Sequence, residues 1–379
     1  MTPSSPVRPP RFQSTSTRTV CWAGASAICG TRCCSDGGPN VSRAATRTVA
    51  RASIRSPPNA HQPAPAANVT TTAAAINPRL TAPLNATIRS THRPGRGYKR
   101  RVEIDTALAR RLVDSQFPQW SGRALELVDP AGSDHVIHRL GDDLSVRLPR
   151  HSGAVNQARL ESEWLPRLAP HLPLAIPAPV AVGEPGLGYP WHWAVTRWLP
   201  GGPATDSVAN AVLLADFLSA LQAVPAVGSA LVTDERLAAR DDATRAAIAQ
   251  VAGVFDAGAL TAVWEAALRA PLWDRAPVWF HGDFHQGNLL GDGGRVTAVI
   301  DFGGLGRGDP ARDMMMPFTL MSAGTRAVFR DRLGVDDATW ARGRGWALAT
   351  GLNAYCSYAA TVPRVAAATT KQITEVLAG

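Results

Sequence analysis

One stretch of the sequence constrains the fold more than any other. Residues 280–313 read FHGDFHQGNLLGDGGRVTAVIDFGGLGRGDPARD. The apolar run VWF leads into a short loop that holds Asp283 and Asn288, and Asp301 closes a second apolar run. Between them, GDGG is a strong hairpin signal. We expect this hairpin to hold the three polar side chains at one end of a small sheet.

The three residue types suit transfer of a phosphoryl group from a nucleoside triphosphate. That chemistry relies on positioning and charge neutralisation, so it needs a carboxylate beside the attacking hydroxyl and oxygen ligands for Mg²⁺. We expect Asp283 to be the catalytic base. Because Mg²⁺ takes one or two protein ligands alongside phosphates and waters, we expect Asn288 and Asp301 to supply them. Taken singly, these residues are better explained as a loop cap (Asp283), a turn residue (Asn288) and a solvated carboxylate at a strand end (Asp301), and the combination is what indicates the function.

The order of the motifs resembles the aminoglycoside phosphotransferase family, whose members are relatives of the protein kinases. HGDxxxxN, IDF and GDPxxD follow one another at residues 281–288, 300–302 and 308–313. The resemblance implies an α+β, two-lobed, protein-kinase-like fold with a small antiparallel-sheet N-lobe and a mostly helical C-lobe. It also implies ATP or GTP as co-substrate, Mg²⁺ as cofactor and a small-molecule hydroxyl acceptor. It covers the chain from about residue 104 to the carboxyl end.

Other residues of this stretch have supporting roles. We expect His281 to brace the loop through hydrogen bonds and His285 to face solvent. A zinc site is discounted, because alternate residues of a loop seldom converge on a tetrahedral ion without further Cys or His ligands. The resemblance implies a structural role for Asp309, which would tie this segment to the helical lobe. The resemblance implies the same structural role for Asp313, for which the alternative is to cap a helix. Methionines 314–316 are expected to fill the core.

A small sheet should precede this stretch and cover the nucleotide. Three short strands are expected, joined by tight turns that favour an antiparallel sheet. The turn at 130–134, which contains Ser133, is expected to lie over the phosphates, where backbone amides face negative charge. The expected strands span residues 124–128, 135–140 and 144–148.

A kinase normally holds the α- and β-phosphates with a lysine on the third strand, paired with a glutamate on the next helix. The two lysines of this chain, Lys99 and Lys371, are both in the wrong place. Arg147 fills the position and resembles the family's arginine-bearing branch, and Glu161 is its expected partner. The alternatives are an ordinary exposed strand arginine and a solvated glutamate on a helix face.

A proline- and glycine-rich segment, 177–188, and an apolar strand, 191–198, follow. The resemblance makes this the linker between lobes, where the backbone near Trp198 binds the nucleotide base. The later sequence has a helical period and is expected to build the acceptor pocket. The expected helices, including two before the linker, span residues 105–117, 156–168, 206–224, 243–255, 260–270, 317–333 and 337–358.

The chain is predicted to begin with a disordered tail. Residues 1–100 hold 13 arginines, one lysine and a single acid, Asp36, so they carry +13 although the whole chain carries +9. They are rich in Pro, Ser, Thr and Ala and cannot bury enough surface to offset chain entropy. Nucleic-acid binding, a targeting peptide and spurious translated upstream sequence are all compatible with this composition. The predicted divisions are therefore a tail, 1–100, an N-lobe, 101–201, and a C-lobe, 202–379.

The folded part is expected to be a cytoplasmic enzyme. Four of the five cysteines lie in the tail, which leaves Cys356 alone in the body, and neither a disulfide framework nor a zinc site is indicated. No apolar run reaches the ~18 residues of a membrane helix, so we expect no membrane partner, and no nucleic-acid partner for the enzyme. The acceptor could be an aminoglycoside, which would imply antibiotic resistance, a macrolide, or a metabolite such as homoserine or an amino alcohol. Two rival hypotheses are a nucleotide-binding pseudoenzyme and a nucleic-acid-binding protein that acts through the basic tail.

Overall fold

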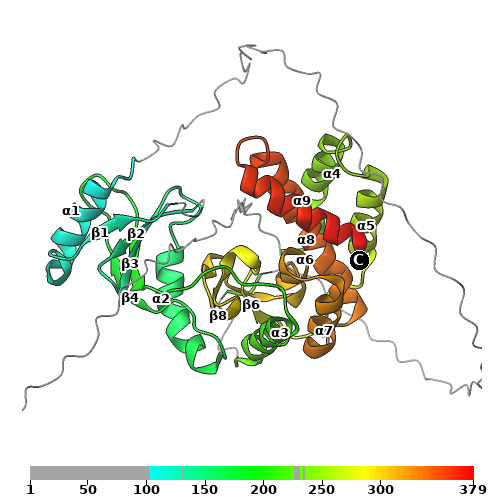
Figure 1. Ribbon diagram of the computed structural model, residues 1–379, viewed down its shortest axis with the longest axis horizontal. Helices are drawn as coiled ribbons and strands as arrows, with labels where there is room; N and C mark the ends of the chain where they lie inside the picture. The colour runs from blue at the N-terminus through cyan, green and yellow to red at the C-terminus, as the bar shows by residue number, and fades with distance from the viewer. Residues whose placement is uncertain (1–102, 130–131, 133, 226–230, 234) are drawn as a thin grey trace, which may run out of the picture. The chain divides into compact units, whose positions relative to one another are not determined.

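The computed structural model describes residues 103–379 except 130, 131, 133, 226–230 and 234 (Figure 1). The tail predicted to be disordered, residues 1–100, and the predicted phosphate-loop residue Ser133 lie outside the described residues. The elements follow one another as α1 (Thr106–Gln116), β1 (Leu125–Leu127), β2 (His135–Leu140), β3 (Leu144–Pro149), α2 (Gln157–Leu168), β4 (Pro179–Gly183), β5 (Trp193–Arg197), α3 (Val208–Ala223), α4 (Asp241–Gln250), α5 (Ala257–Arg269), β6 (Val278–Phe280), β7 (Leu289–Asp292), β8 (Arg295–Val299), β9 (Gly306–Gly308), α6 (Met316–Leu320), α7 (Ala323–Leu333), α8 (Asp337–Tyr358) and α9 (Pro363–Ala378).

The first part of the chain forms a five-stranded antiparallel sheet in the order β1-β2-β3-β5-β4. The three predicted strands are confirmed to within a residue or two at their ends. Helix α1 starts where the Asp105 carboxylate accepts the Leu108 amide, and it buries Leu112 and Val113 in the apolar core that the sheet also lines. The segment 177–188 was expected to be linker only, yet β4 lies within it because its backbone pairs with β5.

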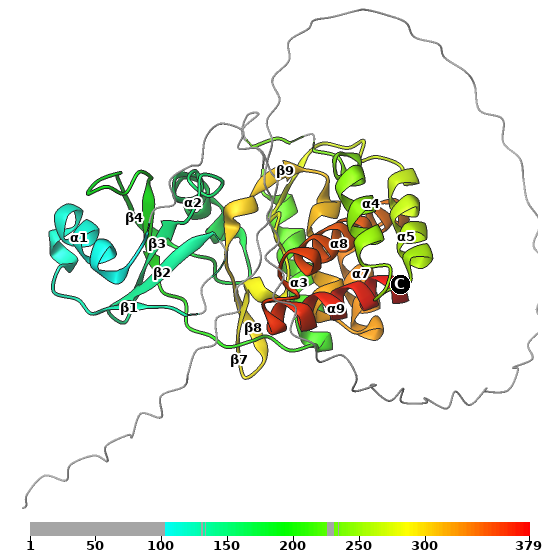
Figure 2. The same ribbon diagram turned by 90° about the horizontal axis from the view of Figure 1, so that it is seen from above.

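The rest of the described chain is mostly helical, with two short two-stranded sheets among the helices. Strand β6 pairs with β9, and the predicted hairpin is confirmed as β7 with β8. Helices α4, α5, α8 and α9 share one apolar core, and α8 and α9 pack along each other (Figure 2). The methionines at 314–316 are buried, as expected. No helix among the described residues has both the length and the apolar character that a membrane crossing requires.

Two helix predictions for this region need correction. The single helix expected over 317–333 is two helices, because the chain turns extended at Ser322 and restarts as α7. Asp206 stabilises this break by accepting from the Ser322 amide at 2.9 Å and the Thr325 hydroxyl at 2.6 Å. Helix α9 was not predicted, although it is as amphipathic as the predicted helices α1 and α2. It buries Ile373 and Val376 in the core it shares with α8. The predicted division of the lobes after residue 201 stays a prediction.

Candidate active site

The loop after β6 is held in place from two sides. The amides of His281 and Gly282 each donate to the Asp313 carboxylate at 2.8 Å. Gly282 has a φ of +84°, and a Cβ there would lie 2.1 Å from the Gly304 carbonyl oxygen. Glycine tolerates that backbone conformation and that close approach, whereas other residues do not. The sequence HGD therefore presents Asp283 from a rigid turn.

Asp313 does not cap the helix that follows, which was one of the two roles expected for it. Its carboxylate binds the loop 31 and 32 residues earlier in the chain. Burial raises its pKa to about 7, against the opposing effect of the two amides. Asp309 ties the segment to the helical part through Arg342 of α8, at 2.6 and 3.0 Å, which agrees with the expectation for that residue.

His281 braces the loop, as predicted. Its Nε2 donates to the carbonyl oxygen of Ile300 at 3.1 Å, and its Nδ1 accepts from the Asp283 amide at 3.2 Å. Burial lowers its pKa to about 4, although the charges of Asp283 and Asp301 oppose the shift. A neutral imidazole has one donor and one acceptor, and both are used here. The His281 side chain therefore connects the segment that carries Asp283 to the segment that carries Asp301.

His285 does not face solvent, contrary to the prediction. Its side chain is only 14% exposed, and its Nε2 lies 3.5 Å from Asp283 Oδ2. The other ring nitrogen accepts from the Gly287 amide at 2.9 Å, which leaves Nε2 to carry the proton toward the carboxylate. Burial opposes the charged imidazolium, but Asp283, with a smaller contribution from Asp301, raises the pKa of His285. The loop folds back on itself here, and a local sequence reading does not reveal that.

Asp283 and Asn288 meet directly. Asp283 is 7% exposed, and the Asn288 side-chain amide donates to both its carbonyl oxygen, at 2.8 Å, and its Oδ2, at 3.1 Å. Both bonds use the amide nitrogen, and the amide oxygen of Asn288 accepts no hydrogen bond from another described residue. That oxygen is a hard ligand of the kind that Mg²⁺ prefers.

Asp301 reaches the same place from the end of β8. The Ile300 amide donates to the Asn288 carbonyl oxygen at 2.9 Å, which joins the two segments. Asp301 has a φ of +65°, a left-handed conformation that costs free energy in a residue other than glycine. Such backbone outliers persist where surrounding structure enforces them, often at functional sites. The carboxylate accepts from Arg147 at 3.3 Å.

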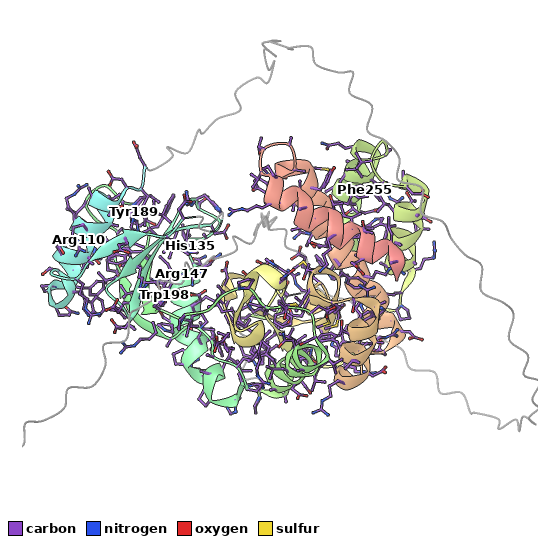
Figure 3. All side chains as sticks on the ribbon, in the orientation of Figure 1. Arg110, His135, Arg147, Tyr189, Trp198 and Phe255 are labelled. Carbon is purple, nitrogen blue, oxygen red and sulfur yellow. The ribbon has the colours of Figure 1, made fainter. Side chains whose placement is uncertain are left out.

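Arg147 links the sheet to this end of the helical part. One guanidinium nitrogen lies 2.6 Å from Glu161, which is 1% exposed, and the other contacts Asp301. Burial alone would lower the pKa of Arg147, but the two carboxylates raise it, so the guanidinium stays charged. The predicted contact between Arg147 and Glu161 is present, and Glu163 pairs instead with Arg167. Figure 3 shows Arg147 with Trp198 in the sheet part of the molecule.

Two cavities, called hollows below, are lined by residues of this site. A small one, about 110 Å³, is lined by Arg147, Trp198, Asn288 and Asp301, among others. A larger one, about 540 Å³, opens beside Asp283 and is walled by α4, α8 and α9. The larger volume is within the range of about 300–1,000 Å³ that small-molecule sites occupy. Its α9 wall was missed in the sequence because the helix itself was missed, and no motif marks the residues that line it.

Comparisons with known proteins agree with this architecture. Solved structures that match include the GDP and kanamycin complex of APH(2″)-IIia, which is 19% identical with a TM-score of 0.58 and covers 71% of this chain and 97% of that one. The GDP complex of wild-type aminoglycoside 2′-phosphotransferase-IIIa is 20% identical with a TM-score of 0.57, covering 73% and 99%. Macrolide 2′-phosphotransferase type I is 19% identical with a TM-score of 0.51, covering 71% and 98%.

At these identities the likeness establishes the fold, which is the two-lobed, kinase-like one expected from the sequence. No curated protein sequence matches the chain. The model of the phosphotransferase enzyme family (APH) matches residues 98–346, about two thirds of the chain. The chain belongs to the phosphotransferase enzyme family.

Proposed function

We propose that the protein transfers the γ-phosphoryl group of ATP or GTP to a hydroxyl group of a small molecule. One observation carries the proposal. The Asp283 carboxylate lines a hollow large enough for an acceptor, and Asn288, which is bonded to that carboxylate, lines the smaller hollow that also holds Arg147 and Asp301. A carboxylate so placed can orient a hydroxyl on one side toward a phosphate on the other, and positioning is a main source of rate in phosphoryl transfer.

The proposed step assigns a role to each group. Asp283 accepts the proton of the acceptor hydroxyl as that oxygen forms its bond to the γ-phosphorus, and the bond to the bridging oxygen breaks to release the nucleoside diphosphate. His285 is a positioning residue, because its protonated Nε2 faces Asp283 Oδ2. Arg147, set by Glu161, holds the triphosphate, and its bidentate fork suits phosphate oxygens. The base of the nucleotide lies near Trp198.

The residues present fit a divalent cation. Asn288 has an amide oxygen free of hydrogen bonds to described residues, and the Asp301 carboxylate lines the same small hollow. Mg²⁺, when bound, neutralises triphosphate charge, and these two residues would hold it. Two protein ligands suffice, since phosphate oxygens and waters complete the shell. The proposed location is the cytoplasm, where nucleotides and Mg²⁺ are supplied.

A screen of hydroxyl compounds with ATP and with GTP tests the proposal, with phosphorylated product detected by mass spectrometry. Aminoglycosides belong in the screen because structures with this fold include aminoglycoside phosphotransferases, and phosphorylation of one would indicate antibiotic resistance. Macrolides, homoserine and amino alcohols complete it. Nucleotide binding without any product would favour a pseudoenzyme, and absence of both would refute the proposal.

A further inference from the structure

The large cavity beside Asp283 has an excess of positive charge. Its described lining contains four cationic side chains besides histidine, which are Arg240, Arg312, Arg364 and Lys371. Asp283 is the single carboxylate in that lining. A molecule that enters the cavity must bring the hydroxyl it offers to Asp283 past these cations.

Two of the cations are compensated from behind the cavity wall. Glu235 lies 2.6 Å from Arg240 and 2.8 Å from Arg312. Both guanidinium groups also lie near the Trp346 ring, 5.8 and 4.7 Å from its centroid. Shared pairing with one carboxylate still leaves this corner of the cavity with a positive balance. Arg240 and Arg312 are thus held in the cavity wall by their contacts with Glu235 and Trp346.

The other two cations lie on α9 and meet no carboxylate of the lining. Arg364 and Lys371 are seven residues apart, two helical turns, which places them on one side of the helix. The Arg364 side chain forms neither a hydrogen bond nor an ion pair with another described residue. Lys371 Nζ donates to the carbonyl oxygens of Thr319 and Leu320, at 3.1 and 3.0 Å. Asp206, outside the lining, interacts with this charge, but no carboxylate of the cavity lining pairs with it.

Most of the remaining lining is small or apolar. Such side chains leave room for a bulky body, and the polar ones among the rest, such as Gln250, Asn353 and Gln372, are uncharged. The small or apolar side chains include Ala243, Ala247, Met315, Trp346, Ala349 and Ala368. An acceptor with several positive charges would lose hydration beside like charges and gain one carboxylate, which is an unfavourable exchange.

We propose that the acceptor is a hydroxyl compound with a largely apolar body and no net positive charge, and that Arg364 and Lys371 discriminate against polycationic acceptors. This inference rests on the proposed phosphotransfer, since it concerns the acceptor site of that reaction. Like charges placed against the wrong ligand are a common source of specificity. The two residues determine acceptor choice, and neither takes part in the chemical step.

Reversing the two charges on α9 tests the inference through ligand affinity, a measurement that does not require catalysis. Kanamycin, an aminoglycoside with several ammonium groups, and its fully N-acetylated form, which keeps the hydroxyls and loses the charge, are titrated by calorimetry. The R364E/K371E double variant should bind kanamycin about tenfold more tightly than wild type, because two repulsive charges become attractive. The affinity for the acetylated form should change by less than about twofold. R269E/R275E is the matched control, since both arginine side chains are 70% exposed and lie outside the cavity lining.

The acceptor screen supplies the second measurement. The inference is supported if the best acceptor is uncharged or anionic and kanamycin turns over at least about 100-fold more slowly. It is overturned if kanamycin is the preferred acceptor, or if R364E/K371E binds it no better than the control, and either result leaves phosphotransfer itself intact. If no acceptor is phosphorylated while charge reversal still tightens kanamycin binding, phosphotransfer fails and the charge inference stands.

Discussion

The two hollows near Asp283 are built in different ways. On the proposed nucleotide side, Arg147 bridges Glu161 and Asp301 across segments far apart in the chain, and Asn288 is bonded to Asp283. The acceptor side is a wide space between helices, lined by small side chains and a few cations. Preorganised polar groups stabilise the charge that develops in a transition state, whereas a roomy wall selects by shape and charge. The proposed nucleotide side should therefore determine whether the reaction occurs, and the acceptor side should determine which compound is phosphorylated.

Removal of the Asp283 carboxylate should have the largest effect. D283A should lower phosphoryl transfer by at least about 1,000-fold with every acceptor, in the upper part of the range for a lost general base. Nucleotide affinity should stay within about threefold, because Asp283 is not assigned to the triphosphate. Product formation by mass spectrometry and a nucleotide titration measure the two quantities. Turnover at the wild-type rate would show that another group is the base.

The next largest effect should come from the second acidic residue. D301A should weaken Mg²⁺-dependent nucleotide binding about 100-fold, since it removes a proposed ligand and leaves Arg147 without one of its carboxylates. The measurement is nucleotide affinity across a Mg²⁺ titration. D292N, an exposed carboxylate in the same hairpin, is the control and should titrate like wild type. An unchanged metal dependence in D301A would remove Asp301 from the metal site.

A smaller effect is expected when Arg147 is replaced by lysine, the residue that kinases use at this position. R147K keeps the charge but loses the planar fork that contacts Glu161 and Asp301 together, so the nucleotide KM should rise about tenfold. The acceptor KM should not change, which would sharpen the contrast between the two sides. R167K on the exposed face of α2 serves as control. Equal rises in both KM values would mean that the two regions are not separable.

The last effect concerns stability, not activity, and it depends on pH. Because the pKa of His281 falls to about 4 on folding from about 6.5, its contribution is fully present above pH 6.5 and is lost as pH falls through about 4. The shift corresponds to about 3 kcal/mol. The free energy of unfolding of wild type should thus exceed that of H281Q by a margin that shrinks between pH 7 and pH 4.

Urea denaturation at a series of pH values measures this margin. Asp313 acts in the opposite direction, since its raised pKa, about 7, favours the folded state at low pH and loses that contribution as pH rises through 7. Both proteins keep Asp313, so its effect cancels in the comparison. A margin independent of pH would mean that His281 is not held neutral by burial.

Much of the site was predictable because its parts are close in sequence or follow a known order. The spacing from Asp283 to Asn288 spans one turn, and the β7–β8 hairpin returns the chain to Asp301, so local geometry brings them together. The solvent exposure expected for His285 and the helix cap expected as one role of Asp313 were wrong for a common reason. Each residue contacts a group that the local pattern does not specify, Asp283 across a folded loop and the backbone of a segment 31 and 32 residues away.

The sequence by itself determined the family, the kinase-like architecture and the residue types that can perform phosphoryl transfer, since short motifs and apolar periods act over a few residues. Tertiary structure alone decided which side chains line the acceptor cavity. Residues that face a core and residues that face a pocket have the same period along a helix, and the packing of α4, α8 and α9 separates them. The charge of the acceptor site thus became visible only when α9 was placed against α8.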